Sequence, residues 1–342
     1  MSNPPEEPAV HEEFYFQWHL TQRCNLRCRH CYQVDYSTSN ELPLEKLFCI
    51  CDLLNHTMEV WKRKGALSLT GGEPFLRKDD LFQLIHYIDN KPNLIYFDIL
   101  TNGTMINEAD IERLRSSKKL RRIQLSLEGP TNEVNDYIRG PGSFTMICKA
   151  IRLLKSYGLQ VAVMMTLSQH NVALLPRMVS FLNSLEVDAF SVERLIPEGR
   201  GEGLKNELLT KEEVREAFNL LHQTALNGGK PKILLYRPLF ALLDVDNPTV
   251  GAVCSIGNNA LTIMHDGTVY PCRRLPIQIG NIFTDGIFKI WYTSQLLWEI
   301  RDCRNLKGKC SGCDYIALCR GCRAMAYFAY NDYLMEDPQC WL

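Results

Sequence analysis

The sequence predicts an α/β fold: a partial (β/α)₆ barrel of the TIM type, followed by a small cysteine-rich domain. From Phe14 to about residue 200, apolar segments rich in β-branched residues alternate with helical segments, which is typical of a parallel sheet with right-handed crossovers. Polar and glycine motifs recur at the carboxyl ends of several of these segments, which favours a barrel over an open sheet. After residue 250 the pattern changes to short strands, turns and eight of the 14 cysteines, and such segments usually need metal to fold.

The elements follow from the period of the apolar residues. Strands are predicted at 14–20, 66–70, 95–101, 122–128, 160–166 and 189–196, with short ones at 260–265 and 268–272. Helices are predicted at 44–65, 79–90, 108–117, 144–158, 175–185 and 211–227. Gly65 and Gly158 stand where helix C-caps are expected. The expected domains are a loose tail at 1–13, the barrel at 14–205, a helical linker at 206–249 and the cysteine-rich domain at 250–342.

Composition excludes several classes of protein. The chain has 342 residues, 46% of them hydrophobic and 23% charged, as in ordinary globular proteins. A net charge of −1 argues against binding to nucleic acid, which usually requires a basic excess. The polar start is no signal peptide, and no apolar run approaches the roughly 18 residues of a membrane span, so we expect a cytoplasmic protein without membrane attachment.

The number of cysteines is unusual for such a protein. Disulfides are rare in the reducing cytoplasm, so 14 cysteines indicate metal or redox chemistry. Cys49, Cys51 and Cys148 lie in apolar helical segments and are expected to be buried core thiols. The other 11 cysteines cluster near the two ends of the chain.

Three cysteines directly follow the first predicted strand. Cys24, Cys28 and Cys31 have CxxxCxxC spacing, so their thiolates can bind three irons of a [4Fe–4S] cluster from one loop. The fourth iron would then lack a protein ligand and could bind a small molecule. The alternatives are reduced thiols without a ligand and a zinc site, which would need a distant fourth ligand such as His30.

A second motif follows the second strand. Tyr32 comes after the last of the three cysteines, and Gly71, Gly72, Glu73 and Pro74 form a GGEP sequence. The combination resembles the signature of radical S-adenosylmethionine (SAM) enzymes. The resemblance implies that GGEP contacts the amino group of SAM and that the paired glycines expose backbone groups to it. It also implies that a reduced cluster cleaves SAM to methionine and a 5′-deoxyadenosyl radical, which abstracts hydrogen from a substrate.

Further strand ends match the same family. The resemblance implies that Ser126 and Thr166 lie near the carboxylate and ribose of SAM, and that Asn102, Glu128 and Arg194 also line its site. A turn or capping role is the alternative for each residue. Arg139 is expected to pin the loop after the fourth strand. No general acid or base is predicted, since a structural role is favoured for His19, His30, His170 and His265.

The C-terminal cysteines resemble the SPASM extension, which holds two auxiliary iron–sulfur clusters. The resemblance assigns an outer cluster to Cys310, Cys313, Cys319 and Cys340, and an inner cluster to Cys254, Cys272 and Cys322. Two departures matter: only two residues separate Cys319 from Cys322 where three are usual, and no extra cysteine follows Cys254. The inner cluster is therefore either open to substrate or completed by Cys303. Zinc is disfavoured, because the five-residue spacer before Cys319 is shorter than the about 15–20 residues of a zinc ribbon.

The resemblance leaves the substrate open between two subfamilies. The favoured substrate is a ribosomal peptide or a protein side chain, and the alternative is modification or decarboxylation of iron-porphyrin propionates. Ferredoxin or flavodoxin is the expected electron donor. A non-enzymatic iron–sulfur carrier or zinc scaffold is the competing class, but such a protein would have no use for the GGEP motif.

Overall fold

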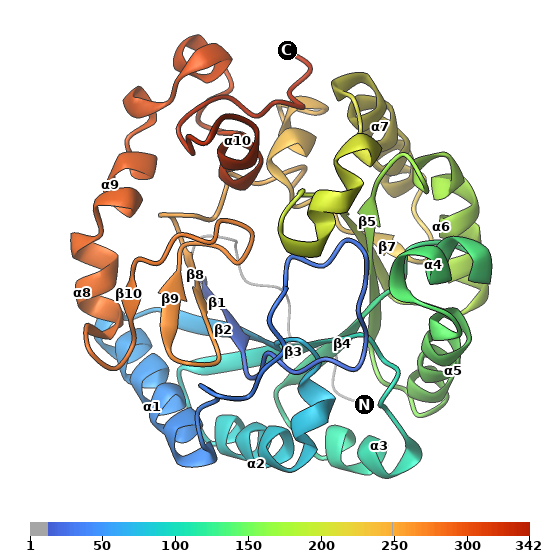
Figure 1. The fold of residues 1–342 in the computed structure, drawn as a ribbon, viewed down its shortest axis with the longest axis vertical. Coiled ribbons are helices and arrows are strands. Elements are labelled where there is room, and N and C mark those ends of the chain that lie inside the picture. The colour runs from blue at the N-terminus through green and yellow to red at the C-terminus, as the bar shows by residue number, and fades with distance from the viewer. Residues whose placement is uncertain (1–12, 248) are drawn as a thin grey trace.

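The computed structural model describes residues 13–247 and 249–342, and its strands form one 10-stranded sheet in the order β10-β9-β8-β1-β2-β3-β4-β5-β6-β7. Neighbouring core strands are all parallel, and the helices lie outside the curved sheet (Figure 1). This confirms the predicted partial barrel. Its core strands are β1 (Glu13–His19), β2 (Lys64–Thr70), β3 (Leu94–Thr101), β4 (Leu120–Ser126), β5 (Val161–Leu167) and β6 (Ala189–Arg194).

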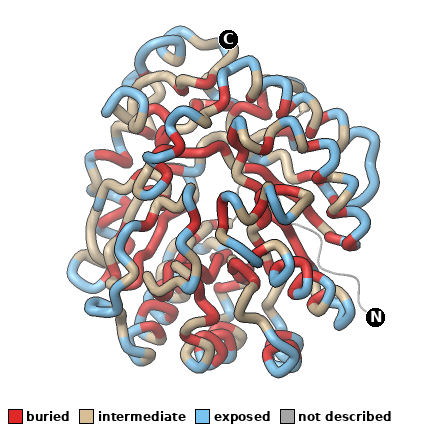
Figure 2. Tube along the Cα trace, turned by 45° about the vertical axis from the view of Figure 1, so that its right-hand side comes forward, coloured by how far each residue is buried: buried red, intermediate tan, exposed pale blue. Residues whose placement is uncertain are grey.

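Side chains alternate between the two faces of each strand, and in β1 one face packs against the outer helices. In β1, Phe14, Phe16 and Trp18 are fully buried, and the ring of Phe14 packs 5.1 Å from that of Trp61 in the first helix. Buried segments follow the strands through the interior, while exposed segments lie at the periphery (Figure 2). The outer helices are α1 (Leu44–Trp61), α2 (Lys78–Asp89), α3 (Glu108–Arg115), α4 (Asn132–Arg139), α5 (Ser143–Ser156), α6 (Leu175–Ser184) and α7 (Lys211–Leu226).

Several local predictions are corrected. The helix expected at 44–65 ends at Trp61, because Lys62 takes the left-handed conformation (φ 52°) that ends it. Gly65 is therefore not a C-cap; it lies in β2, where a Cβ would be 2.7 Å from Leu94 Cδ2. Gly158, with φ 76°, does follow the end of α5 as predicted. The prediction for Cys49 is wrong, since its side chain is exposed on α1.

Residues beyond the core strands extend the same sheet. The two-residue strand β7 (Lys232–Ile233) pairs with β6, and β8 (Ala260–Ile263) pairs in parallel with β1. The sheet thus runs from the barrel into the cysteine-rich part of the chain. That part also contains β9 (Thr268–Tyr270), β10 (Gly280–Asn281), α8 (Gly286–Thr293), α9 (Gln295–Arg301) and α10 (Arg323–Tyr330).

Short 3₁₀ segments make many of the connections. They are η1 (Pro74–Arg77), η2 (Val172–Leu174), η3 (Gly199–Glu207), η4 (Pro238–Leu242), η5 (Cys303–Asn305) and η6 (Gly308–Gly312). Of the tail expected at 1–13, residues 1–12 lie outside the described part of the chain, and Glu13 begins β1. None of the described helices has the length and apolarity that crossing a bilayer requires.

Candidate functional site

The cysteine loop after β1 is held against the end of β2 by backbone contacts. The amide of Gly72 donates to the carbonyl of Thr21 (2.8 Å), and the amide of Glu73 donates to that of Arg23 (2.7 Å). A Cβ on Gly71 would lie 2.5 Å from the Thr21 carbonyl oxygen, and one on Gly72 would lie 2.2 Å from that of Arg23. Both glycines are therefore needed because the two backbones approach so closely.

Glu73 joins the ends of β2 and β3. Its fully buried carboxylate accepts hydrogen bonds from Thr101 Oγ1 (2.7 Å) and from the amides of Asn102 (2.7 Å) and Phe75 (3.1 Å). Burial raises the pKa of Glu73 despite these bonds, because its hydrogen-bond donors are neutral groups. Both carboxylate oxygens are thus engaged within the protein, and Glu73 fixes the strand ends around the cysteine loop.

The three thiols of the loop face N–H donors. Backbone amides two residues further along the chain lie 3.4 Å from the sulfurs of Cys24 and Cys31. The Asn102 side-chain amide lies 3.9 Å from Cys24 Sγ, and the Arg139 guanidinium lies 3.9 Å from Cys28 Sγ. Burial raises the pKa of Cys24 to about 11 and raises that of Cys28. Such thiols are protonated at neutral pH when no metal is bound, and they become thiolates when iron binds. The N–H donors then stabilise the negative charge on the sulfurs. The donor set therefore fits an iron–sulfur cluster.

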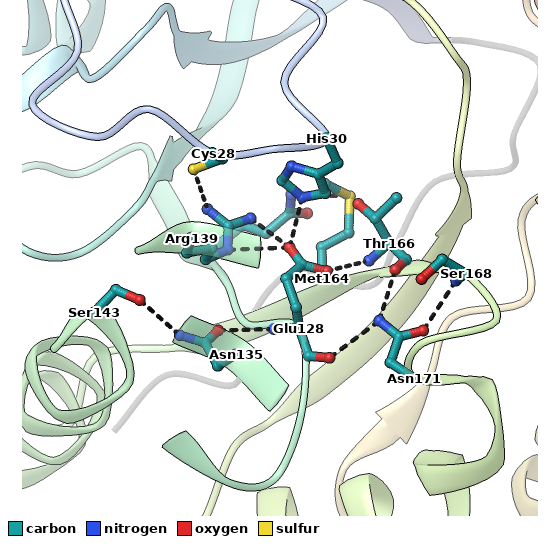
Figure 3. Close-up of polar contacts among 11 residues, drawn as sticks. Cys28, His30, Glu128, Asn135, Arg139, Ser143, Met164, Thr166, Ser168 and Asn171 are labelled. Atoms are coloured by element: carbon teal, nitrogen blue, oxygen red, sulfur yellow. Dashed lines mark hydrogen bonds and ion pairs between the residues drawn. The ribbon is translucent and has the colours of Figure 1, made fainter. Parts of the chain in front are cut away.

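Glu128 is the centre of an ionic network beside this loop (Figure 3). Its fully buried carboxylate accepts from Arg139 Nε (3.0 Å), lies 3.0 Å from His30 Nε2, and accepts from the amide of Thr166 (2.7 Å). Burial alone would raise its pKa, but the charge of Arg139, with His30, lowers the pKa of Glu128 to about 2. The ionised Glu128 thus orients Arg139, whose other end reaches Cys28.

Two asparagines hold the backbone of this network in place. The amide of Glu128 donates to Asn135 Oδ1 (3.0 Å). Asn171 Nδ2 donates to the carbonyls of Glu128 (3.0 Å) and Thr166 (2.9 Å), which joins the ends of β4 and β5. Asn135 belongs to α4, a helix that the sequence pattern did not reveal because few of its residues are apolar.

The other residues predicted to contact SAM lie at the ends of β4, β5 and β6. Ser126 and Thr166 are half-buried at the ends of β4 and β5. Arg194, at the end of β6, is turned toward the C-terminus: its guanidinium forms two bonds with Asp337 (2.9 and 2.7 Å) and one with Gln339 (2.9 Å). Contact of these residues with SAM stays a prediction.

The C-terminal cysteines fall into two groups. Burial raises the pKa of Cys272 to about 12, with further repulsion from Cys322 and Cys254, and Cys322 likewise helps to raise the pKa of Cys254. In a second group, burial raises the pKa of Cys319 to about 12, with repulsion first from Asp337 and then from Cys340 and Cys310. These interactions join three members of the predicted inner set and three of the predicted outer set, but not Cys313, and ligation of clusters by either set stays a prediction.

An arginine group that sequence reasoning missed lies between the two cysteine regions. Arg273, directly after Cys272, stacks 3.8 Å above the ring of Tyr32 and pairs with Glu198 (3.3 Å). Arg237 and Arg274 both pair with Glu193, at the end of β6. The adjacent arginines of the sequence CRR were the only available signal, because the pairing with β6 is not visible in the sequence.

The fold is that of a parallel barrel with three thiols in the loop that follows the carboxyl end of β1, and with further thiols in its C-terminal region. Known sequence families agree. Residues 18–182 match the radical SAM superfamily, and residues 254–323 match the SPASM iron–sulfur cluster-binding domain.

Individual proteins extend the comparison. The chain is 30% identical to the AdoMet-dependent heme synthase of Methanosarcina barkeri, over 94% of this chain and 95% of that protein. It is also 30% identical to the mycofactocin maturase MftC of Mycobacterium ulcerans, over 94% and 86% of the two chains. Among solved structures, Streptococcus suis SuiB bound to precursor peptide SuiA shares the fold, with a TM-score of 0.78 at 19% identity over 97% of this chain and 76% of that one.

The chain belongs to the radical SAM superfamily and carries a SPASM domain. It is a radical SAM enzyme, and its cofactors are SAM and iron–sulfur clusters.

Proposed function

We propose that the chain cleaves SAM at the loop of Cys24, Cys28 and Cys31 and abstracts hydrogen from a peptide or protein side chain. The observation that carries the proposal is the docking of this loop on Gly71 and Gly72, which holds three thiols beside N–H donors at the ends of the strands. The maturase MftC and the subtilosin biosynthesis protein AlbA of Bacillus subtilis, 28% identical over 89% of this chain, support a peptide substrate.

The residues of the chain have separate tasks in this reaction. When bound, the cluster and SAM supply the radical that removes hydrogen. Glu73 and Asn102 hold the ends of β2 and β3 so that GGEP faces the cysteine loop. Arg139, oriented by Glu128, places a positive charge beside Cys28 and offsets the negative charge of a cluster there.

Iron-porphyrin propionates are the second candidate substrate, and the arginine group favours them. Guanidinium groups match carboxylates in shape and charge. Arg237, Arg273 and Arg274 share only Glu193 and Glu198 as carboxylate partners among the described residues, and Arg273 Nε has no hydrogen-bond partner there. The 30% identity to a heme synthase supports the same candidate.

The C-terminal cysteines, the electron donor and the location of the protein in the cell complete the proposal. The inner and outer cysteine groups would ligate one cluster each, with the inner site either open or completed by Cys303. Ferredoxin or flavodoxin would supply electrons. Fourteen free thiols support a reducing, cytoplasmic location.

The first experiment tests SAM cleavage. Protein reconstituted with iron and sulfide under anaerobic conditions receives dithionite and SAM, and 5′-deoxyadenosine is followed by mass spectrometry. We expect product from the native protein and from the exposed-thiol control Cys49→Ala, and none from a variant with Cys24, Cys28 and Cys31 all changed to alanine. Equal product from the triple variant would contradict the proposed site.

A second experiment separates the substrates. Native enzyme is titrated with an iron porphyrin bearing free propionates and with its propionate methyl esters, and the Soret band is followed. Saturable binding of the free acid alone would favour the porphyrin candidate. No binding of either compound would leave the peptide as substrate, to be tested with short precursor peptides encoded beside the gene.

A further inference from the structure

Arg323 is a fully buried arginine at the start of α10, directly after Cys322. Its Nη1 donates to the carbonyls of Tyr333 (3.0 Å) and Met335 (2.7 Å), and its Nη2 lies 4.0 Å from Cys310 Sγ. Its Nε has no hydrogen-bond partner, and no carboxylate lies within salt-bridge distance of it among the described residues. Among the described residues, the guanidinium thus contacts only carbonyls and a thiol, and the carboxylate of Asp332 acts on it from beyond salt-bridge distance.

A buried charge of this kind requires a compensating anion. Burying an ion without a partner costs several kcal/mol, so buried arginines are normally paired with carboxylates. Arg194, the buried arginine nearby, follows that rule, since Asp337 forms two bonds with it. The two carbonyls that Arg323 contacts satisfy hydrogen bonds but carry no net charge.

Negative charge in contact with Arg323 would come from the outer auxiliary set, when its thiols bind iron. The side chain of Arg323 reaches Cys310 of the outer group. Arg323 therefore contacts a member of the outer thiol group, and in the chain it directly follows Cys322, a member of the predicted inner group.

We propose that Arg323 is the electrostatic partner of the outer auxiliary iron–sulfur cluster and raises its reduction potential. The inference rests on the cluster ligation proposed above. Reduction adds negative charge to a cluster, and a nearby buried cation stabilises the reduced form more than the oxidised form. Arg323 is a positioning and tuning residue in this role, without contact to the reacting atoms of the substrate.

The test is a redox titration followed by electron paramagnetic resonance. It uses chains in which Cys24, Cys28 and Cys31 are alanine, so that only auxiliary clusters give a signal. Arg323→Gln keeps an N–H donor for the carbonyls but removes the charge, and Arg323→Lys keeps the charge. Arg304→Met is the matched control, since Arg304 is paired with Asp302 and its side chain is 90% exposed.

We expect Arg323→Gln to lower the reduction potential of the outer auxiliary cluster by about 59 mV or more. For a one-electron couple, this corresponds to at least a tenfold decrease in the ratio of reduced to oxidised cluster at a fixed potential. Arg323→Lys should restore most of that change, and Arg304→Met should cause none. If the Gln variant fails to load clusters while the Lys variant loads them, the requirement for charge is also supported. Equal potentials in Gln, Lys and native proteins, or equal failure of both variants to load, would overturn the proposal. SAM cleavage by the native enzyme is measured separately, so failure of the proposed function remains distinguishable.

Discussion

Glu73 and Glu128 are both fully buried at strand ends, yet their surroundings shift the pKa of the two carboxylates in opposite directions. Neutral donors surround Glu73, so burial dominates and its pKa is raised. Glu128 faces the guanidinium of Arg139 and the ring of His30, so its pKa falls to about 2. The first carboxylate is a hydrogen-bonded connector between strands, whereas the second is a permanent anion that orients a cation toward Cys28.

This difference predicts that Glu128→Gln is strongly destabilising. The substitution keeps the shape but leaves the buried charge of Arg139 unpaired, which typically costs about 3–5 kcal/mol. Urea unfolding under anaerobic conditions measures the loss. The control is Glu112→Gln, because Glu112 forms an exposed pair with Arg115 and such pairs contribute about 0–1 kcal/mol. Equal stability of the two variants would show that Arg139 finds another partner.

Between elements, the critical contact is that of the cysteine loop with the end of β2. Gly72→Ala would place a Cβ 2.2 Å from the Arg23 carbonyl oxygen, so the loop must move away. We expect loss of the SAM-binding cluster with the auxiliary clusters retained. Iron content and the change of the paramagnetic signal on adding SAM measure this. Gly203→Ala is the control, since nothing lies within 4 Å of its Cβ position. A native SAM response in Gly72→Ala would contradict the close approach.

Secondary-structure elements and contiguous motifs could be predicted from the sequence, whereas contacts between distant elements could not. The six core strands were found because each is a run of apolar residues, and the cysteine loop and GGEP were found because each motif is contiguous in sequence. The pairing of β8 with β1 was not found, because a four-residue strand carries no mark of a partner more than 240 residues away. For the same reason, the contacts of Arg194 with Asp337 and of Arg323 with Cys310 could not be predicted.

At the scale of the whole molecule, the barrel and the C-terminal region are joined in several ways. β8 extends the sheet from β1, and Arg274 donates to the carbonyl of Arg194 (2.6 Å) at the end of β6. Asp337 binds Arg194 and also accepts from the amide of Cys322 (2.8 Å). A shared sheet and a buried ion pair couple the two parts energetically, so neither should unfold alone.

Asp337→Asn tests that coupling. The change leaves Arg194 buried without its anion, so we expect a loss of about 3–5 kcal/mol. Because the parts are coupled, hydrogen exchange should report the same loss in β5 of the barrel as in α10. Asp302→Asn is the control, since Asp302 pairs with the exposed Arg304 and should change stability by about 1 kcal/mol or less. If exchange accelerated in α10 while β5 kept its native protection, the C-terminal region would be an independent unit attached to the barrel. An equal loss of protection in β5 and α10 would mean that the ion pair stabilises the barrel and the C-terminal region as one cooperative structure. The C-terminal thiols would then keep their positions relative to the cysteine loop after β1.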